Sequence, residues 1–206
     1  TSATVAGVTT STSATTGAAT TGGSATCDAP PADGTAPVID DFEDNDHIIS
    51  PNEGRLGYWY EYGDSDGTQM TAPLDGVDGV GGVLTSTGSG FTEYVGFGVD
   101  LNNDNANSEP CEYDASAHTG IQFDITNDVD VLFQVALPST IADSDHYGFA
   151  VPAGTNTAFQ VPFAMLEQGG WGDAATWDAS KILQLQWQVA DPTMAFDITL
   201  DNVTFY

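Results

Sequence analysis

The chain has 206 residues, of which 40% are hydrophobic, and its 30 Asp and Glu residues against two Lys and Arg give a formal net charge of −28 at pH 7. So few basic side chains exclude nucleic acid and anionic membrane surfaces as partners, because both need clustered Lys and Arg. No run of about 18 apolar residues occurs in the sequence, so no membrane-spanning helix is expected.

The N-terminal segment differs sharply in composition from the remainder of the chain. Residues 1–26 consist of Thr, Ser, Ala and Gly apart from two valines, and none is charged. Such a tract is typical of an extracellular stalk, but its loose alternation would also let it add as a strand to an exposed sheet edge. A Pro-rich connector follows over residues 28–37. We therefore expect a tail and connector over 1–37 and one β domain over 38–206, in a secreted chain whose leader has been removed.

The domain consists of short apolar runs separated by Gly, Pro, Asn and Asp, which is typical of an all-β sandwich or barrel. Helical periodicity is weak, and we expect at most a turn or two near residues 163–167. The expected strands are 38–43, 57–62, 82–86, 94–100, 119–126, 129–137, 147–151, 158–162, 182–189 and 196–205.

Clean alternation in three of these strands predicts one apolar and one polar sheet face. Apolar positions that share a face are 121/123/125, 131/133/135/137 and 183/185/187/189, which places Trp187 in the core. The opposite positions of the last strand are Gln184, Gln186 and Gln188. Glutamine is not a favoured strand residue, so strand propensity does not explain three glutamines on one face of a strand.

Several stretches of the domain resemble a known family. They are 39–44 (IDDFED), 54–60 (GRLGYWY), 88–91 (GSGF), 113–121 (YDASAHTGI), 161–163 (VPF), 185–189 (LQWQV) and 198–205 (ITLDNVTF). In this order they are similar to the jelly-roll carbohydrate-binding modules of secreted bacterial proteins, close to family 11. The resemblance implies a jelly-roll β-sandwich and a polysaccharide ligand, and the tail lies outside it.

Sugar binding needs flat aromatic rings for the pyranose faces, and amides or carboxylates for the hydroxyls. The chain offers tyrosines on one side of a strand, the glutamine row, and further polar residues that we expect on the same sheet face. An alternative is a solvated outer face with the aromatic rings in the core. The candidate carbohydrate-binding residues are Tyr58, Tyr60, Tyr62, Gln122, Asp124, Gln184, Gln186 and Gln188, with Trp171 in a Gly-rich loop as a lid or ligand platform.

The resemblance also implies a structural Ca²⁺ held by acids of the first and last strands. The matching positions are Glu43, with Asp41, and Asp201. Calcium requires six to eight oxygen ligands, and joining the two ends of the domain through it would close the fold. The alternative is that these acids are solvated at sheet edges.

The two cysteines, Cys27 and Cys111, are far apart and lack the spacing of metal ligands. In a secreted chain we expect them to form one disulfide, with two free thiols as the alternative.

The sequence shows none of the common catalytic motifs, and the three histidines lack a partner at a known catalytic spacing. We therefore expect a non-catalytic, extracellular module that binds a polysaccharide. The second hypothesis is a structural subunit of a surface layer or filament that polymerises when residues 1–26 are donated to a neighbour. Deleting the tail separates the two, because only assembly should depend on it.

Overall fold

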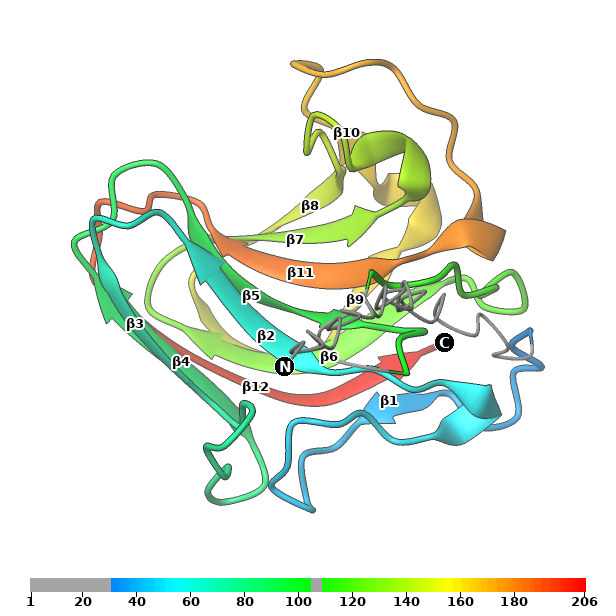
Figure 1. Cartoon of the computed structure of the whole chain (residues 1–206), viewed down its shortest axis with the longest axis horizontal. Helices are drawn as coiled ribbons and strands as arrows, with labels where there is room; N and C mark the ends of the chain where they lie inside the picture. Colours follow the sequence, from blue (N-terminus) through cyan, green and yellow to red (C-terminus); the bar gives the residue numbers. More distant parts are fainter. Residues whose placement is uncertain (1–30, 105–108) are drawn as a thin grey trace, which may run out of the picture.

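A computed structural model describes residues 31–104 and 109–206. Two antiparallel six-stranded sheets lie face to face, and the apolar core fills the space between them (Figure 1). No helix among the described residues is long and apolar enough to cross a membrane. The expected all-β sandwich is therefore confirmed.

The first sheet, named here the β12 sheet, has the order β3-β4-β12-β6-β9, and β1 pairs with the far end of β12. Its strands are β1 (Val38–Asp40), β3 (Thr68–Ala72), β4 (Leu84–Ser89), β6 (Gly120–Asn127), β9 (Gly154–Pro162) and β12 (Phe196–Phe205).

The second sheet, the β11 sheet, has the order β10-β8-β7-β11-β5-β2. Its strands are β2 (Trp59–Gly63), β5 (Val95–Asp100), β7 (Val131–Ala136), β8 (Tyr147–Val151), β10 (Glu167–Gln168) and β11 (Gln184–Val189). The 3₁₀ turns are η1 (Asn52–Gly54), η2 (Pro138–Thr140), η3 (Phe163–Met165) and η4 (Ala179–Lys181).

The alternating patterns lie as expected, and β8 and β12 have the expected bounds. Two strands, β3 and β10, were not expected. The sequence of β3, Thr-Gln-Met-Thr-Ala, contains no run of apolar residues that would indicate a strand. It forms because its backbone pairs with β4, a tertiary effect that local propensity does not report.

Trp187 is the centre of the core and is fully buried. Its indole stacks on Phe97 at 5.8 Å and 9° between ring planes, and meets Phe123 and Phe133 edge-on at 5.5 and 5.2 Å. Trp59 approaches from β2 at 5.6 Å. Because these rings come from both sheets, Trp187 fixes how the two layers meet.

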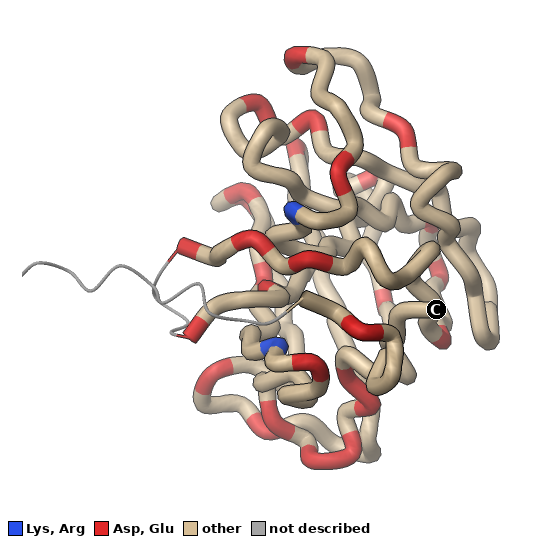
Figure 2. The backbone as a smooth tube through the Cα atoms, turned by 90° about the vertical axis from the view of Figure 1, so that its right-hand side faces the viewer, with Lys and Arg blue, Asp and Glu red and all other residues tan. Residues whose placement is uncertain are grey.

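Acidic residues are spread along the described backbone, and the two basic residues stand apart from each other (Figure 2). Arg55 is the buried one, at 1% exposure. Its guanidinium donates to Glu53 at 2.5 Å and to the carbonyls of Ala36 and Val38 at 2.8 and 2.6 Å, and it packs on the Phe205 ring. This one side chain therefore ties the end of the connector to β12.

Glu53 completes this buried cluster. Burial acts to raise its pKa, but hydrogen bonds from Arg55, from His118 and from the backbone N–H of Gly34 outweigh burial and lower the pKa from 4.5 to about 2. A carboxylate with a lowered pKa contributes stability above its unfolded-state pKa and loses it as pH falls toward the folded-state value.

We predict that Glu53→Gln lowers the free energy of unfolding at pH 7 by about 3 kcal/mol, because it leaves the buried guanidinium without its counter-charge. The wild-type protein should lose this increment between about pH 4.5 and 2, and the variant should show a correspondingly shallower pH dependence. Urea denaturation from pH 7 to pH 3 measures both effects, with the exposed Glu61→Gln as the control. Equal pH slopes for wild type and Glu53→Gln would contradict the assignment.

Candidate functional site

The outer face of the β11 sheet is organised in rows that cross the strands. The register places Tyr60 of β2, Gly98 of β5, Gln186 of β11, Gln134 of β7 and Gly148 of β8 next to one another in that order. The adjoining row consists of Tyr62, Gly96, Gln188, Leu132 and Ala150. The face therefore presents tyrosines, then glycines, then amides.

The glycines of β5 let the tyrosine rings lie down on the sheet. A Cβ added at Gly98 would lie 2.7 Å from the Tyr60 hydroxyl, and one at Gly96 would lie 2.6 Å from the Tyr62 hydroxyl. Any side chain at these positions would push the rings away from the sheet. Burial raises the pKa of both phenols, so both hydroxyls stay protonated at physiological pH.

The amide row is connected at one end and open at the other. Gln184 donates to Asp100 at 2.8 Å, and Gln186 donates to the Tyr60 hydroxyl at 3.1 Å and to the Gln184 oxygen at 3.3 Å. Burial raises the pKa of Asp100, although the hydrogen bonds from Asn103 and Gln184 oppose the rise. These contacts fix the orientation of the first two amides.

A cavity of about 370 Å³ opens on this face beside the amide row. Two of its aromatic residues are well exposed, Trp171 at 64% and Tyr94 at 42%, and the Tyr94 ring stacks on Tyr62 at 6.5 Å. The full lining is Tyr62, Tyr94, Gln134, Ser144, His146, Trp171, Gln186 and Gln188. Aromatic rings and amides thus converge on one hollow.

The loop that carries Trp171 is held by hydrogen bonds to two aspartates. Asp145, 1% exposed, accepts the backbone N–H of Gly170 at 2.9 Å and of Gly172 at 3.1 Å. Asp143 accepts the N–H of Asp173 at 2.6 Å. The indole is therefore exposed but set in place, which reduces the entropy lost when a ligand stacks on it.

Six of the candidate residues proposed from the sequence come together on this face, namely Tyr60, Tyr62, Gln184, Gln186, Gln188 and Trp171. Tyr58 lies just before β2, with its ring 5.5 Å from that of His47. The expectation that Gln122 and Asp124 share the face of the glutamine row is wrong. Both belong to β6 in the β12 sheet, where Gln122 bonds Gln160 and Asp124 bonds Ala158 and Asn202.

Three residues that line the cavity, Tyr94, Gln134 and His146, are not among the candidates proposed from the sequence. Only the register with neighbouring strands, which the sequence does not contain, shows that these three side chains line one cavity.

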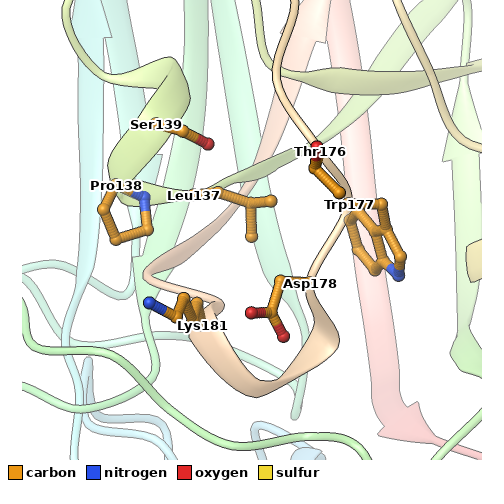
Figure 3. A pocket seen from close by; sticks show the side chains of 7 residues that line it. All are labelled: Leu137, Pro138, Ser139, Thr176, Trp177, Asp178 and Lys181. Carbon is orange, nitrogen blue, oxygen red and sulfur yellow. The ribbon is translucent and has the colours of Figure 1, made fainter.

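A second hollow of about 320 Å³ lies between η2 and the segment that ends in η4 (Figure 3). Trp177 forms one wall, and its ring packs on Tyr147 and on Phe163, each at 5.2 Å. Lys181, at the rim, pairs with Glu112 at 3.7 Å. Within the part of the chain that the structure describes, no buried polar atom without a partner lines this hollow, so it is the weaker candidate.

The acids expected to bind calcium lie close enough to repel one another. Burial raises the pKa of Asp201, and the charges of Asp124, Glu43 and Asp41 raise it further. Their oxygen donors suit Ca²⁺. However, no three His, Cys, Asp or Glu residues within 31–104 and 109–206 are grouped tightly enough to hold a metal ion.

The expected disulfide and the expected docking of the tail both involve residues before residue 31. Cys27 and residues 1–26 lie outside the described residues, so the Cys27–Cys111 disulfide and the docking of the tail remain predictions. Cys111 itself is 7% exposed, and its backbone N–H donates to the carbonyl of Asn102 at 2.8 Å.

No protein-family model matches the chain. Among solved structures, it is similar to the family 11 carbohydrate-binding module from Clostridium thermocellum in complex with a β-1,3-1,4-mixed-linked tetrasaccharide, with a TM-score of 0.56 and 19% identity over 82% of this chain and 94% of that one. The family 11 module of the cellulosomal cellulase Lic26A-Cel5E of the same organism gives a TM-score of 0.56 at 20% identity, covering 82% and 93% of the two chains. The chain has the jelly-roll fold of these modules.

A curated relative is similar in sequence. Endoglucanase 3 of Fibrobacter succinogenes is 27% identical over an alignment of 180 residues that covers 76% of this chain. The match spans only 24% of that relative's length. The similarity therefore concerns one part of a longer protein.

We predict that Gly98→Ala destabilises the domain by about 1–3 kcal/mol, because its Cβ would lie 2.7 Å from the Tyr60 hydroxyl and 2.8 Å from the Leu185 carbonyl. Gly148→Ala is the matched control, since its nearest neighbour is the flexible end of Leu132 at 3.0 Å. Urea denaturation measures both variants. Equal losses of stability would show that Tyr60 does not depend on the glycine.

Although the acids expected to bind calcium form no preformed metal site in the described residues, their mutual repulsion would be relieved by a cation. We therefore predict that millimolar Ca²⁺ raises the melting temperature of the wild-type protein and that a chelator reverses the rise, because a cation bound only by the folded state stabilises it. Asp201→Asn should abolish the response. The same variant should melt higher than the wild-type protein in chelator, since it removes a carboxylate that is repelled by its neighbours. A wild-type melting temperature that does not change on addition of Ca²⁺ would contradict the calcium site.

Proposed function

We propose that the protein is a non-catalytic carbohydrate-binding module that holds a neutral polysaccharide on the outer face of the β11 sheet. The observation that carries the proposal is the row of glutamine amides beside tyrosine rings that lie flat on the sheet, opening into a cavity under Trp171. The shared fold of the family 11 modules supports it.

Each part of this surface suits a sugar polymer. Pyranose rings have apolar faces that pack on aromatic rings, and Trp171 and Tyr94 expose such rings at the cavity. Sugar hydroxyls both donate and accept, and an amide offers two donors and an acceptor in one group. Glutamines at alternate positions of β11 repeat roughly every 6.8 Å, so one strand can contact successive sugars of a chain.

The charges of the site favour a neutral ligand. The eight residues that line the cavity include neither Lys nor Arg, and the carboxylates of Asp100 and Asp145 lie within or next to the site. An anionic polysaccharide would be repelled by these groups and by the net charge of −28. We therefore propose that uronic acid polymers are excluded.

The carboxylates near the cavity accept hydrogen bonds that hold other protein groups in place. Asp100 accepts Gln184 and Asn103, and Asp145 accepts two backbone N–H groups of the Trp171 loop. A glycosidase needs two carboxyl groups that face the scissile bond, and these acids face the protein. The role that fits is attachment to an extracellular polysaccharide.

The similarity to one part of an endoglucanase fits this role, since a binding module increases contact between a catalytic domain and its polymer. The alternative of a filament subunit gains no support from the described residues or from the relatives named above. The tail on which it depends lies outside the described residues.

Affinity electrophoresis and calorimetry with soluble polysaccharides test the proposal. We predict that mixed-linked β-1,3-1,4-glucan or another neutral polymer such as xylan or mannan retards the protein, and that polygalacturonate does not. Trp171→Ala and Gln186→Ala should each weaken binding by about five- to 150-fold, because each removes roughly 1–3 kcal/mol of stacking or hydrogen bonding.

The matched control is Gln122→Ala, which removes an equivalent amide from the β12 sheet and should leave the affinity unchanged. The proposal fails if no neutral polysaccharide is retained by the wild-type protein, or if Gln122→Ala weakens binding as much as Gln186→Ala does.

A further inference from the structure

Gln134 is a buried amide whose hydrogen bonds are incomplete. It lies in the middle of the β11 sheet, between Gln186 of β11 and Gly148 of β8, and is only 2% exposed. Its side-chain oxygen is buried and has no hydrogen-bond partner. Gln184, two positions along the neighbouring strand from Gln186, has both ends of its amide bonded. The buried hydroxyl of Tyr62, which lines the same cavity, also has no partner.

An unpaired polar group in the interior destabilises a fold, and most such groups find a partner in protein or water. Gln134 lines the cavity under Trp171, and its neighbour Gly148 has no side chain to cover it. A 180° turn of the amide exchanges its oxygen and nitrogen, so it can present either a donor or an acceptor to a ligand there. The missing partner is therefore expected on the cavity side.

His146 lines the same cavity, and its hydrogen bonds define its tautomer. The Thr140 hydroxyl accepts the backbone N–H of Leu137 at 3.1 Å, donates to the carbonyl of Leu137 at 3.1 Å, and lies 2.8 Å from Nδ1 of His146. Since the hydroxyl has one proton, all three contacts are hydrogen bonds only when Nδ1 of His146 carries a hydrogen. Nε2 is then a bare acceptor.

The neutral state of His146 agrees with its surroundings. The ring is 7% exposed, and burial lowers its pKa, although the nearby carboxylates of Asp143 and Asp145 oppose the fall. No protein partner for Nε2 occurs among the residues that the structure describes.

The third wall of the cavity is the indole of Trp171. Its loop is fixed by Asp145, the residue directly before His146, so the stacking surface and the acceptor are set by adjacent positions of one segment. The indole also packs over Gly169, where an added Cβ would lie 1.7 Å from the ring. A sugar stacked on Trp171 would turn its ring hydroxyls toward the cavity walls.

We propose that Gln134 and His146 form a hydroxyl-binding subsite beneath Trp171, in which two ring hydroxyls of a neutral pyranose supply the hydrogen bonds that the folded chain leaves unmade. The inference rests on the proposed function. It adds to that function the place in the cavity where the hydroxyls of the sugar are recognised. Gln134 in this view lowers the stability of the free protein and raises its affinity for the ligand.

The test uses Gln134→Met, which keeps the length of the side chain and removes the amide. Calorimetric titration with the β-1,3-1,4-mixed-linked tetrasaccharide, or with whichever neutral polysaccharide retards the wild-type protein, should show at least a tenfold loss of affinity. The melting temperature of the free variant should equal or exceed that of the wild-type protein. Gln184→Met is the matched control for stability, and it should melt lower because its amide is bonded.

His146→Phe keeps a ring and removes the acceptor, and it should also weaken binding about tenfold. Nitrogen NMR of the wild-type imidazole should show a protonated Nδ1 and a bare Nε2 whose signal moves when the sugar is added. Gln122→Met, on the other sheet, should not change the affinity.

The outcomes separate the two proposals. If the wild-type protein binds a neutral glycan and Gln134→Met binds it equally well, the subsite is wrong and the function stands. A melting temperature of Gln134→Met as low as that of Gln184→Met would show that the amide is not unpaired, and would also overturn the subsite. If the wild-type protein binds no neutral glycan, both proposals fall.

Discussion

The packing of Trp187 is the constraint on which the rest of the structure depends. Its indole contacts rings from both sheets, so β11 cannot slide or turn without breaking the centre of the core. Since side chains alternate along a strand, a buried Trp187 obliges Gln186 and Gln188 to point outward. The strand register that buries Trp187 in the core therefore also places the glutamine amides in a row on the outer face of the β11 sheet.

Much of this arrangement could be predicted from the sequence. The alternation around Trp187 gave both the core position and the glutamine row, because period-two patterns report which residues share a face of a strand. The pattern does not report which strands are neighbours, and Gln122 was placed on the wrong sheet for that reason. The same limit concealed Gln134, whose unpaired amide depends on its neighbours across the sheet and not on its own strand.

The surface around the cavity is rigid, but it contains a polar group that lacks a hydrogen-bond partner. The glycines of β5 leave room for the tyrosine rings to lie flat on the sheet. Asp145 fixes the loop of Trp171, and Asp100 accepts a hydrogen bond from Gln184. Against this fixed frame, the amide of Gln134 has no protein partner for its oxygen. A surface that is already ordered, and that keeps unused hydrogen-bonding groups for a ligand, binds with a smaller loss of entropy than one that must fold around its sugar.

The most direct test of the account is to follow the backbone amide signals of the labelled protein by NMR while the β-1,3-1,4-mixed-linked tetrasaccharide is added. The account predicts shifts confined to β2, Tyr94 and β5, β7, the 144–146 segment and β8, the 169–173 loop and β11, with the β12 sheet unaffected. Shifts centred on β6 and β9, or no shift with any neutral oligosaccharide tried in its place, would contradict it.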